Sequence, residues 1–382
     1  METRLYTDTD SLAAIRPSWE LWQNQPNNDF DQFLLVCRLR PAVHYPWVMV
    51  IYEQDIPLAV LAGRVETLRF SPAIGYLKLP GIPLKTLTVL YQGFLGRQDG
   101  VTAECLVKAT RHWLSSSDVG EVIFPALEPG SPLHLAVIRQ TSVWFCEKGG
   151  LPQCHWQSVL PDAGDILPGL MKAKHRAGLR KRQRTLQADF EDRIRWQWLT
   201  RFEELSALCQ QIERLAARTY QRGLGAGFRD NQEWRERLGL YAARGTLRVA
   251  LLWIDETLVC FYIGMRYGET LFGAELGYDQ AFKSYSPGIL LILWLMERVR
   301  EEGVYRMDWG LGDAQYKQQL GATTWPEQSL YLFKPTPAHW ILRSLLGITQ
   351  AIDQTARHVL EKTDLTHRIK TAWRRRMIRC DQ

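Results

Sequence analysis

The sequence predicts an α/β (α+β) protein with two similar halves, each a mixed, mostly antiparallel sheet flanked by helices. The chain has 382 residues, enough for two domains that each bury a core. In both halves, strand-like segments follow one another across short turns, and a helical segment then separates them from a further strand. This shared order predicts a tandem duplication.

The second half carries the clearer pattern. A strand-like segment precedes two amphipathic helical segments, and Asp255-Glu256 and Gly268-Glu269 then form tight turns between three strands. Pro287 is well placed as the first residue of the next helix, which Gly303 ends. The expected elements are strand 193–199, helices 202–220 and 234–243, strands 246–254, 257–267 and 270–278, helix 287–302, strand 305–309, helix 314–320 and strand 329–333.

The first half repeats part of this order. We expect strands at 48–52, 56–70 and 73–79, a helix at 101–114 and a strand at 121–125. A turn-rich stretch at 160–164 is the expected join. The predicted division is a degenerate domain at 1–162, a second domain at 163–335, and a helical, basic tail at 336–382.

Charge is concentrated in two segments. The net charge is +6, but residues 172–184 carry seven Lys or Arg, residues 367–380 carry six, and neither segment contains an acid. Each segment is either a solvated helix face or a contact for phosphates or an anionic surface. The tail joins apolar residues to its basic end, so peripheral contact with an anionic membrane is one expectation and packing of residues 340–352 on the domain another.

Several classes of function are disfavoured. Seven cysteines without a C-x-x-C pair favour reduced thiols, no zinc-ligand spacing occurs, and the N-terminal residues lack an apolar signal core. We therefore expect a cytoplasmic protein that uses no metal.

Two motifs of the second half resemble a known family. They are Tyr285-Ser286-Pro287-Gly288 before the helix, and Asp308-Trp309-Gly310-Leu311-Gly312-Asp313-Ala314-Gln315-Tyr316-Lys317 after the next strand. Together they resemble the CelD-like (cellulose-biosynthesis-type) acetyltransferase domain of the GNAT superfamily, and the tandem architecture is similar to that of the FemABX peptidoglycan aminoacyltransferases. The resemblance implies tandem GNAT-like domains and transfer of an acyl group from acetyl-CoA or another acyl-CoA.

The expected donor site lies where the third strand leads into the Pro287 helix. Free N–H groups and a partial positive charge at a helix start suit a pyrophosphate. In the superfamily, this strand and the next diverge, and the pantetheine arm pairs with the exposed strand edge. The candidate donor-binding residues are Tyr278, Lys283, Tyr285, Ser286, as the helix cap, and Gly288.

Acyl transfer needs a base for the nucleophile and an acid for the leaving thiolate. The resemblance places Tyr316 as the acid, while Asp308, between Met307 and Trp309, and Glu275, on the third strand, are candidate bases. Asp313 either binds substrate or caps the helix of Tyr316, and Lys317 either binds an anionic group or is solvated.

Residues 172, 176, 180 and 184 form one cationic stripe on a helix, and Arg176 and Arg180 are the candidate substrate ligands. The glycine-rich residues 223–227 are expected to form a flexible loop. The acceptor is an amino or hydroxyl group, with a sugar or a polysaccharide or lipid precursor as the expectation from the resemblance. The alternatives are an aminoacyl-tRNA-dependent transferase, which the single glycine at the helix start and the basic stripe favour, and a non-catalytic scaffold of exopolysaccharide assembly.

Overall fold

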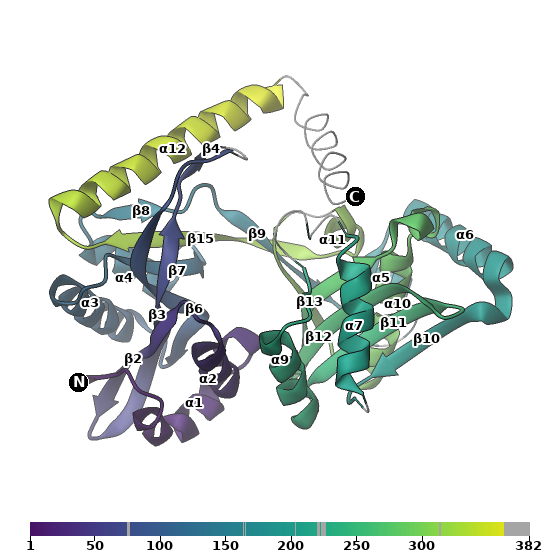
Figure 1. Ribbon diagram of the computed structural model, residues 1–382, viewed down its shortest axis with the longest axis horizontal. Coiled ribbons are helices and arrows are strands. Elements are labelled where there is room, and N and C mark those ends of the chain that lie inside the picture. The colour runs from purple at the N-terminus through teal and green to yellow at the C-terminus, as the bar shows by residue number, and fades with distance from the viewer. Residues whose placement is uncertain are drawn as a thin grey trace. The chain divides into compact units, whose positions relative to one another are not determined.

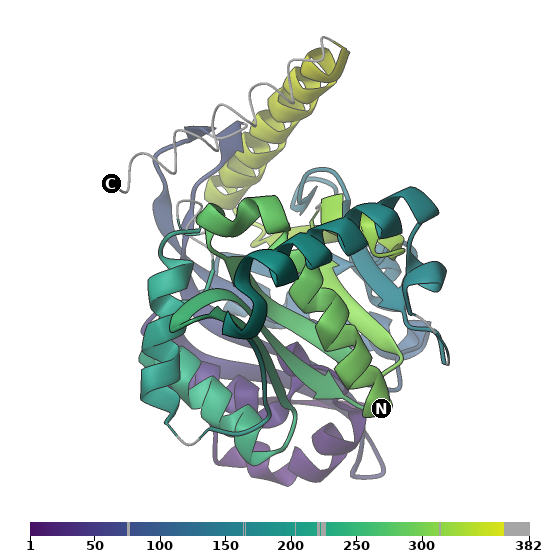
Figure 2. The same ribbon diagram turned by 90° about the vertical axis from the view of Figure 1, so that its right-hand side faces the viewer.

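The computed structural model describes residues 1–362 except 75–76, 163, 165, 203, 220–221, 223–226 and 313–314, with the backbone alone at 77–78, 315 and 356–362. The chain forms two compact units (Figures 1 and 2). Unit 1 comprises Met1–Gln153 and the segment from Trp325 through the last described helix, and unit 2 comprises Cys154–Thr324.

Unit 1 contains a mostly antiparallel sheet in the order β1-β2-β3-β6-β7-β15, with β8 also pairing with β15. Strands β6 and β7 are parallel, as the helix between them requires. The strands are β1 Glu2–Tyr6, β2 Val43–Glu53, β3 Ile56–Phe70, β6 Ile82–Gly96, β7 Glu121–Leu127, β8 Cys146–Lys148 and β15 Thr323–Phe333, and a separate hairpin joins β4 Ala73–Ile74 to β5 Leu77–Lys78.

Helices cover both faces of this sheet. One core packs against α3 and α4, and the other against α1 and α2. The helices are α1 Arg16–Trp22, α2 Phe30–Leu39, α3 Gly100–Ser116 and α4 Pro132–Gln140, with 3₁₀ turns at Ser11–Ala14 and Pro26–Asn28. The strand expected at 73–79 is wrong, because the third long strand is β6, which pairs with β3 from Ile82 onward, whereas 73–74 and 77–78 form only the small hairpin.

Unit 2 repeats the plan, with strand order β10-β11-β12-β13-β14-β9. Strands β10 to β13 are consecutive antiparallel neighbours, β14 is parallel to β13, and β9 is antiparallel to β14. The strands are β9 Gln153–Val159, β10 Ile194–Leu199, β11 Leu247–Ile254, β12 Thr257–Tyr267, β13 Thr270–Tyr278 and β14 Arg306–Leu311.

The helices of unit 2 lie on opposite sides of the sheet. Residues of α7 and α9 share one core with β11–β13, and residues of α5, α6 and α10 share the other. The helices are α5 Ile166–Leu170, α6 Ala173–Phe190, α7 Leu205–Ala216, α9 Gln232–Ala243, α10 Pro287–Glu301 and α11 Gln315–Gln319, with 3₁₀ turns η3 Glu191–Arg193 and η4 Gln280–Tyr285. The element order predicted for the second half is confirmed from β10 to β15.

Each unit takes its last strand from the other half of the sequence. Strand β9 ends the first half of the chain but pairs with β14 in unit 2, whereas β15 ends the second half but pairs with β7 in unit 1. The compact units therefore do not follow the linear division at residues 162 and 335. The boundaries of the units depend on pairing between strands that are far apart in the sequence, and local sequence patterns do not encode such pairing.

Helix α12 Pro337–Lys362 belongs to unit 1. One face packs on the unit, with Thr349 buried and Arg343 Nη2 at 3.0 Å from Glu147 Oε2. The expected packing of residues 340–352 holds for this face only, because Ile341, Ile348 and Ile352 are 59%, 58% and 46% exposed. The basic end of the tail lies outside the described residues. No helix in the described part of the chain combines the length and apolar character needed to cross a bilayer.

Candidate functional site

Strands β13 and β14 diverge, and this fork is the centre of the candidate site. They pair at three positions, from Thr270 with Arg306 to Phe272 with Asp308, although β13 continues to Tyr278. The divergence expected from the resemblance is confirmed. From Gly273 onward, the β13 edge has no β14 neighbour, so its backbone groups are free to pair with an extended ligand.

A β-bulge lies on β13 beside the fork. On the β12 side, Glu275 is opposite Ile263 and Gly273 is opposite Gly264, which leaves Ala274 without a partner. Bulges bend a strand and redirect its side chains, and they are common next to active sites. Here the bulge lies just past Phe272, the last β13 residue that pairs with β14.

The start of α10 follows β13 across η4. Pro287 occupies the first turn, and Ser286 holds the N-cap position in the left-handed conformation, with φ of 55°. The Ser286 hydroxyl does not cap the helix, so the side-chain cap predicted from sequence is wrong; the hydroxyl instead accepts a 2.8 Å hydrogen bond from Arg182 Nη1. Gly288 is buried, and a Cβ there would lie 3.5 Å from the Tyr278 ring.

Helix α6, which carries the basic segment, packs against η4, the turn that leads into α10. The residue that reaches Ser286 is Arg182, which lies outside the predicted stripe. Of the two predicted ligands, Arg176 donates to the Met171 carbonyl at 2.7 Å, and Arg180 is exposed. The basic segment therefore lies beside the expected donor site, and its contact with phosphates stays a prediction.

Lys283 and Tyr285 are the two remaining candidate donor ligands, and they differ in whether their polar groups already have a partner among the described residues of the unit. Lys283 is exposed on η4, whereas Tyr285 donates its hydroxyl to Asp189 Oδ2 at 2.7 Å. This hydrogen bond raises the pKa of Tyr285.

Glu275 is a half-buried carboxyl on β13. Burial raises its pKa to about 7, against the opposing influence of Arg237 and Arg222. Arg237 belongs to α9, so Glu275 faces the side of the sheet that α7 and α9 cover. A carboxyl that titrates near neutral pH is suited to general-base work.

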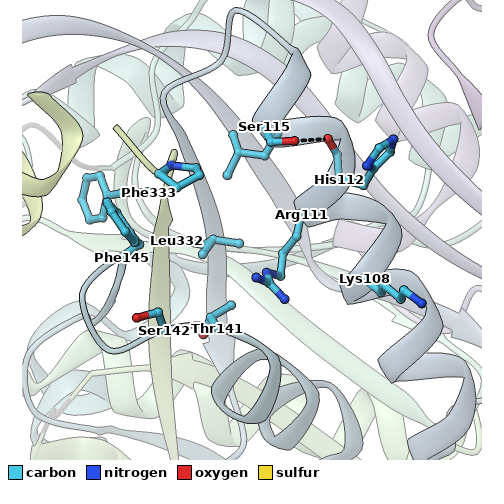
Figure 3. A pocket seen from close by; sticks show the side chains of 11 residues that line it. Lys108, Arg111, His112, Ser115, Thr141, Ser142, Phe145, Leu332 and Phe333 are labelled. Atoms are coloured by element: carbon cyan, nitrogen blue, oxygen red, sulfur yellow. Dashed lines mark hydrogen bonds between the residues drawn. The ribbon is translucent and has the colours of Figure 1, made fainter. Parts of the chain in front are cut away.

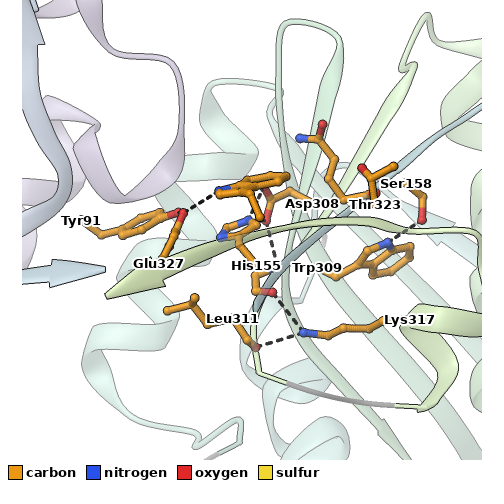
Figure 4. A network of polar contacts seen from close by, with 12 residues as sticks. Tyr91, His155, Ser158, Asp308, Trp309, Leu311, Lys317, Thr323 and Glu327 are labelled. Atoms are coloured by element: carbon orange, nitrogen blue, oxygen red, sulfur yellow. Dashed lines mark hydrogen bonds and ion pairs between the residues drawn. The ribbon is translucent and has the colours of Figure 1, made fainter. Parts of the chain in front are cut away.

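Asp308 is held in a buried pair with a residue that the sequence analysis missed (Figure 4). His155 Nε2 lies 3.0 and 2.9 Å from the two Asp308 carboxylate oxygens, and the Gly310 amide donates to Asp308 Oδ1 at 2.9 Å. His155 lies on β9, in the half of the sequence opposite to that of Asp308. The pair orients the carboxylate beside the fork, where β14 leaves β13.

Two residues of α11, Tyr316 and Lys317, contact the end of β14. Tyr316 packs edge-on against Trp309, whose indole donates to Ser158 Oγ at 2.8 Å. Lys317 is buried, and its ammonium donates to three carbonyls of residues 310–312 at 2.9–3.1 Å (Figure 4). This geometry favours a structural role for Lys317, and its role as a substrate ligand stays a prediction. Asp313 and most of the 223–227 loop lie outside the described residues.

Sequence reasoning missed His155, Arg182 and Tyr262. Tyr262 lies within the apolar run of β12. Two glycines could have indicated it, Gly264 on the same strand and Gly273 on the neighbouring strand β13. Arg182 is exposed, and it follows the buried Leu179 by three residues, so it borders the face of α6 that packs on the unit.

Unit 1 contains a separate hollow of about 300 Å³ beside α3 (Figure 3). Lys108, Arg111 and His112 are among the residues that line it, and they are exposed. No group of three His, Cys, Asp or Glu residues that could hold a metal gathers in the described residues of either unit.

The fork, the bulge and the helix that starts beside them form the arrangement that the resemblance to the GNAT superfamily implies. In agreement, residues 173–318 match the family described as acetyltransferase (GNAT) domain. The chain is therefore an acyltransferase with a tandem GNAT fold.

Three solved structures are similar along nearly the whole chain. One is FemX, at 10% identity and a TM-score of 0.58, covering 90% of this chain and 100% of that one. Another is a tandem GNAT protein from the clavulanic acid biosynthesis pathway, at 13% identity and 0.50, covering 88% and 99%. L-PGS from Bacillus licheniformis has 14% identity and 0.50, covering 89% and 97%. At these identities the likeness shows the fold alone, and no curated protein matches the sequence.

Proposed function

We propose that unit 2 transfers an acyl group, with acetyl as the first candidate, from acyl-CoA to an amino or hydroxyl group. The observation that carries this proposal is the fork, where β13 continues for six residues beyond its last pair with β14. An extended pantetheine arm can hydrogen-bond to that free edge as an added strand would.

The phosphates of the donor would lie at the start of α10. The helix N-terminus supplies backbone N–H groups and a partial positive charge, and Pro287 removes one N–H that would otherwise need a partner. Arg182 and the exposed Lys283 supply cations from α6 and η4. These residues support the proposal that the donor phosphates bind next to the open strand edge.

Glu275 would act as the general base and Tyr316 as the general acid. The lone pair of the acceptor amine or hydroxyl attacks the thioester carbon, the proton of the acceptor passes to the Glu275 carboxylate, and the C–S bond breaks. The Tyr316 hydroxyl gives its proton to the departing thiolate. A pKa of about 7 for Glu275 keeps a large fraction of this base ionised at neutral pH. Asp308, held by His155, would orient groups at the fork.

The acceptor is proposed to be a sugar or a polysaccharide or lipid precursor, as the CelD-like motifs imply. The exposed apolar row of α12, formed by Ile341, Leu345, Ile348 and Ile352, favours peripheral contact with an anionic membrane in combination with the basic residues 367–380. Binding of the chain to phosphatidylglycerol vesicles, compared with an Ile341→Ser, Ile348→Ser variant, tests this contact. Equal binding of both proteins would contradict it.

The second candidate is aminoacyl transfer from tRNA. The structural likeness to FemX and the basic helix α6 favour it, given the resemblance to the FemABX aminoacyltransferases. Titration of the chain with acetyl-CoA and with aminoacyl-tRNA separates the two. Tight binding of acetyl-CoA with release of CoA thiol supports the first proposal. Binding of tRNA without CoA binding would replace it with the second, and binding of neither would favour the scaffold.

A further inference from the structure

The Tyr262 hydroxyl is a buried polar group that the proposed mechanism does not use. Tyr262 is 2% exposed, and its hydroxyl has no hydrogen-bond partner among the described residues. Burying a hydroxyl without a partner costs about 1–3 kcal/mol in proteins. A bound ligand that accepts a hydrogen bond from the hydroxyl would explain why such a group is buried.

Two glycines make room for this side chain. A Cβ at Gly264 would lie 2.8 Å from Tyr262 Cε1, and a Cβ at Gly273 would lie 2.8 Å from the Tyr262 hydroxyl. Neither glycine has a positive φ, so space, and not backbone conformation, is the reason for glycine at both positions. The phenol therefore crosses Gly264 and places its hydroxyl against the backbone of β13 at Gly273.

Gly273 is the first β13 residue beyond the pairing with β14. Phe272 pairs with Asp308, Ala274 is bulged, and the same Cβ position at Gly273 lies 3.4 Å from the Asp308 carbonyl oxygen. Gly273 itself is exposed. The hydroxyl thus lies at the point where the two strands separate, beside backbone that a ligand can reach.

We propose that the Tyr262 hydroxyl donates a hydrogen bond to the carbonyl oxygen of the donor thioester at this fork. The inference rests on the proposed function and adds a residue that contacts the reacting group. As the acceptor attacks, negative charge develops on that oxygen, and a donor already in place stabilises it. The proton stays on the phenol, because burial, with Tyr316 and Asp308 nearby, raises the pKa of Tyr262 and keeps it neutral.

The test compares the unaltered chain with Tyr262→Phe, and with Tyr331→Phe in unit 1 as the control. The measured reaction is CoA thiol release from acetyl-CoA, by hydrolysis and with glucosamine as an amino acceptor. Loss of one oxyanion donor lowers kcat on the order of 10²-fold, so we expect a fall of that size for Tyr262→Phe with an acetyl-CoA Kd within about twofold.

Thermal unfolding separates this role from a structural one. Because the hydroxyl has no partner among the residues that the structure describes, Tyr262→Phe should leave the Tm unchanged or raise it. A wild-type kcat in Tyr262→Phe, or a loss of kcat that follows a lowered Tm, overturns the inference while the proposed function stands. An unaltered chain that neither binds acetyl-CoA nor releases thiol overturns both.

Discussion

Replacement of Glu275 by Gln should change how stability depends on pH. In the unfolded chain the carboxyl titrates near its ordinary value of 4.5, whereas in the folded protein burial raises the pKa to about 7. Between these values the folded state holds more protons than the unfolded state, so the free energy of unfolding falls as pH rises. A difference of about 2.5 pKa units corresponds to about 3 kcal/mol, an upper value for a half-buried group.

The Glu275→Gln variant lacks this titration. Its stability relative to the unaltered chain should therefore rise by up to about 3 kcal/mol between pH 5 and pH 8. Urea unfolding at both pH values measures the difference. The matched control is Glu256→Gln, an exposed carboxylate in the β11–β12 turn of the same unit.

The same variant tests the chemistry. If Glu275 is the base, the thiol-release rate of the unaltered chain should rise with pH and level off above about 7, and this step should vanish in Glu275→Gln. If unfolding of both proteins shows one and the same pH dependence, the raised pKa and the reasoning from burial are refuted.

Three further changes probe the contacts around the fork. Replacing His155 by Phe leaves the buried Asp308 carboxylate without its imidazole partner, and urea unfolding should show a loss of about 2–3 kcal/mol. Arg182→Ala removes a cation from the start of α10, so isothermal titration should show about fivefold to tenfold weaker CoA binding, while the exposed Arg184→Ala should bind as the unaltered chain does. Equal affinities for the two arginine variants would exclude Arg182 from the donor site. Lys317→Met removes donors to three carbonyls and should lower the free energy of unfolding by about 2 kcal/mol; unchanged stability with a raised donor KM would show instead that Lys317 binds substrate.

Local sequence patterns predicted the elements around the fork well, because these elements follow one another along the chain, whereas the divergence of the two strands was expected from the family resemblance. Short turns at Asp255-Glu256 and Gly268-Glu269 connect neighbouring antiparallel strands, and Pro287 marks the helix start. The same reasoning could not find His155, since the β9–β14 pairing joins residues about 150 positions apart. The Ser286 cap failed for a different reason: its left-handed backbone turns the hydroxyl toward Arg182.

The placement of β15 in unit 1 has a consequence for synthesis on the ribosome. Strand β7 gains its antiparallel neighbour only after residues 323–333 have been made, because β15 is that neighbour. Until then the edge of β7 is available to other strands, which is a risk for aggregation. A gene fragment that stops before residue 323 should therefore yield an unfinished first unit, and chaperone binding during translation should persist until almost the whole chain has emerged.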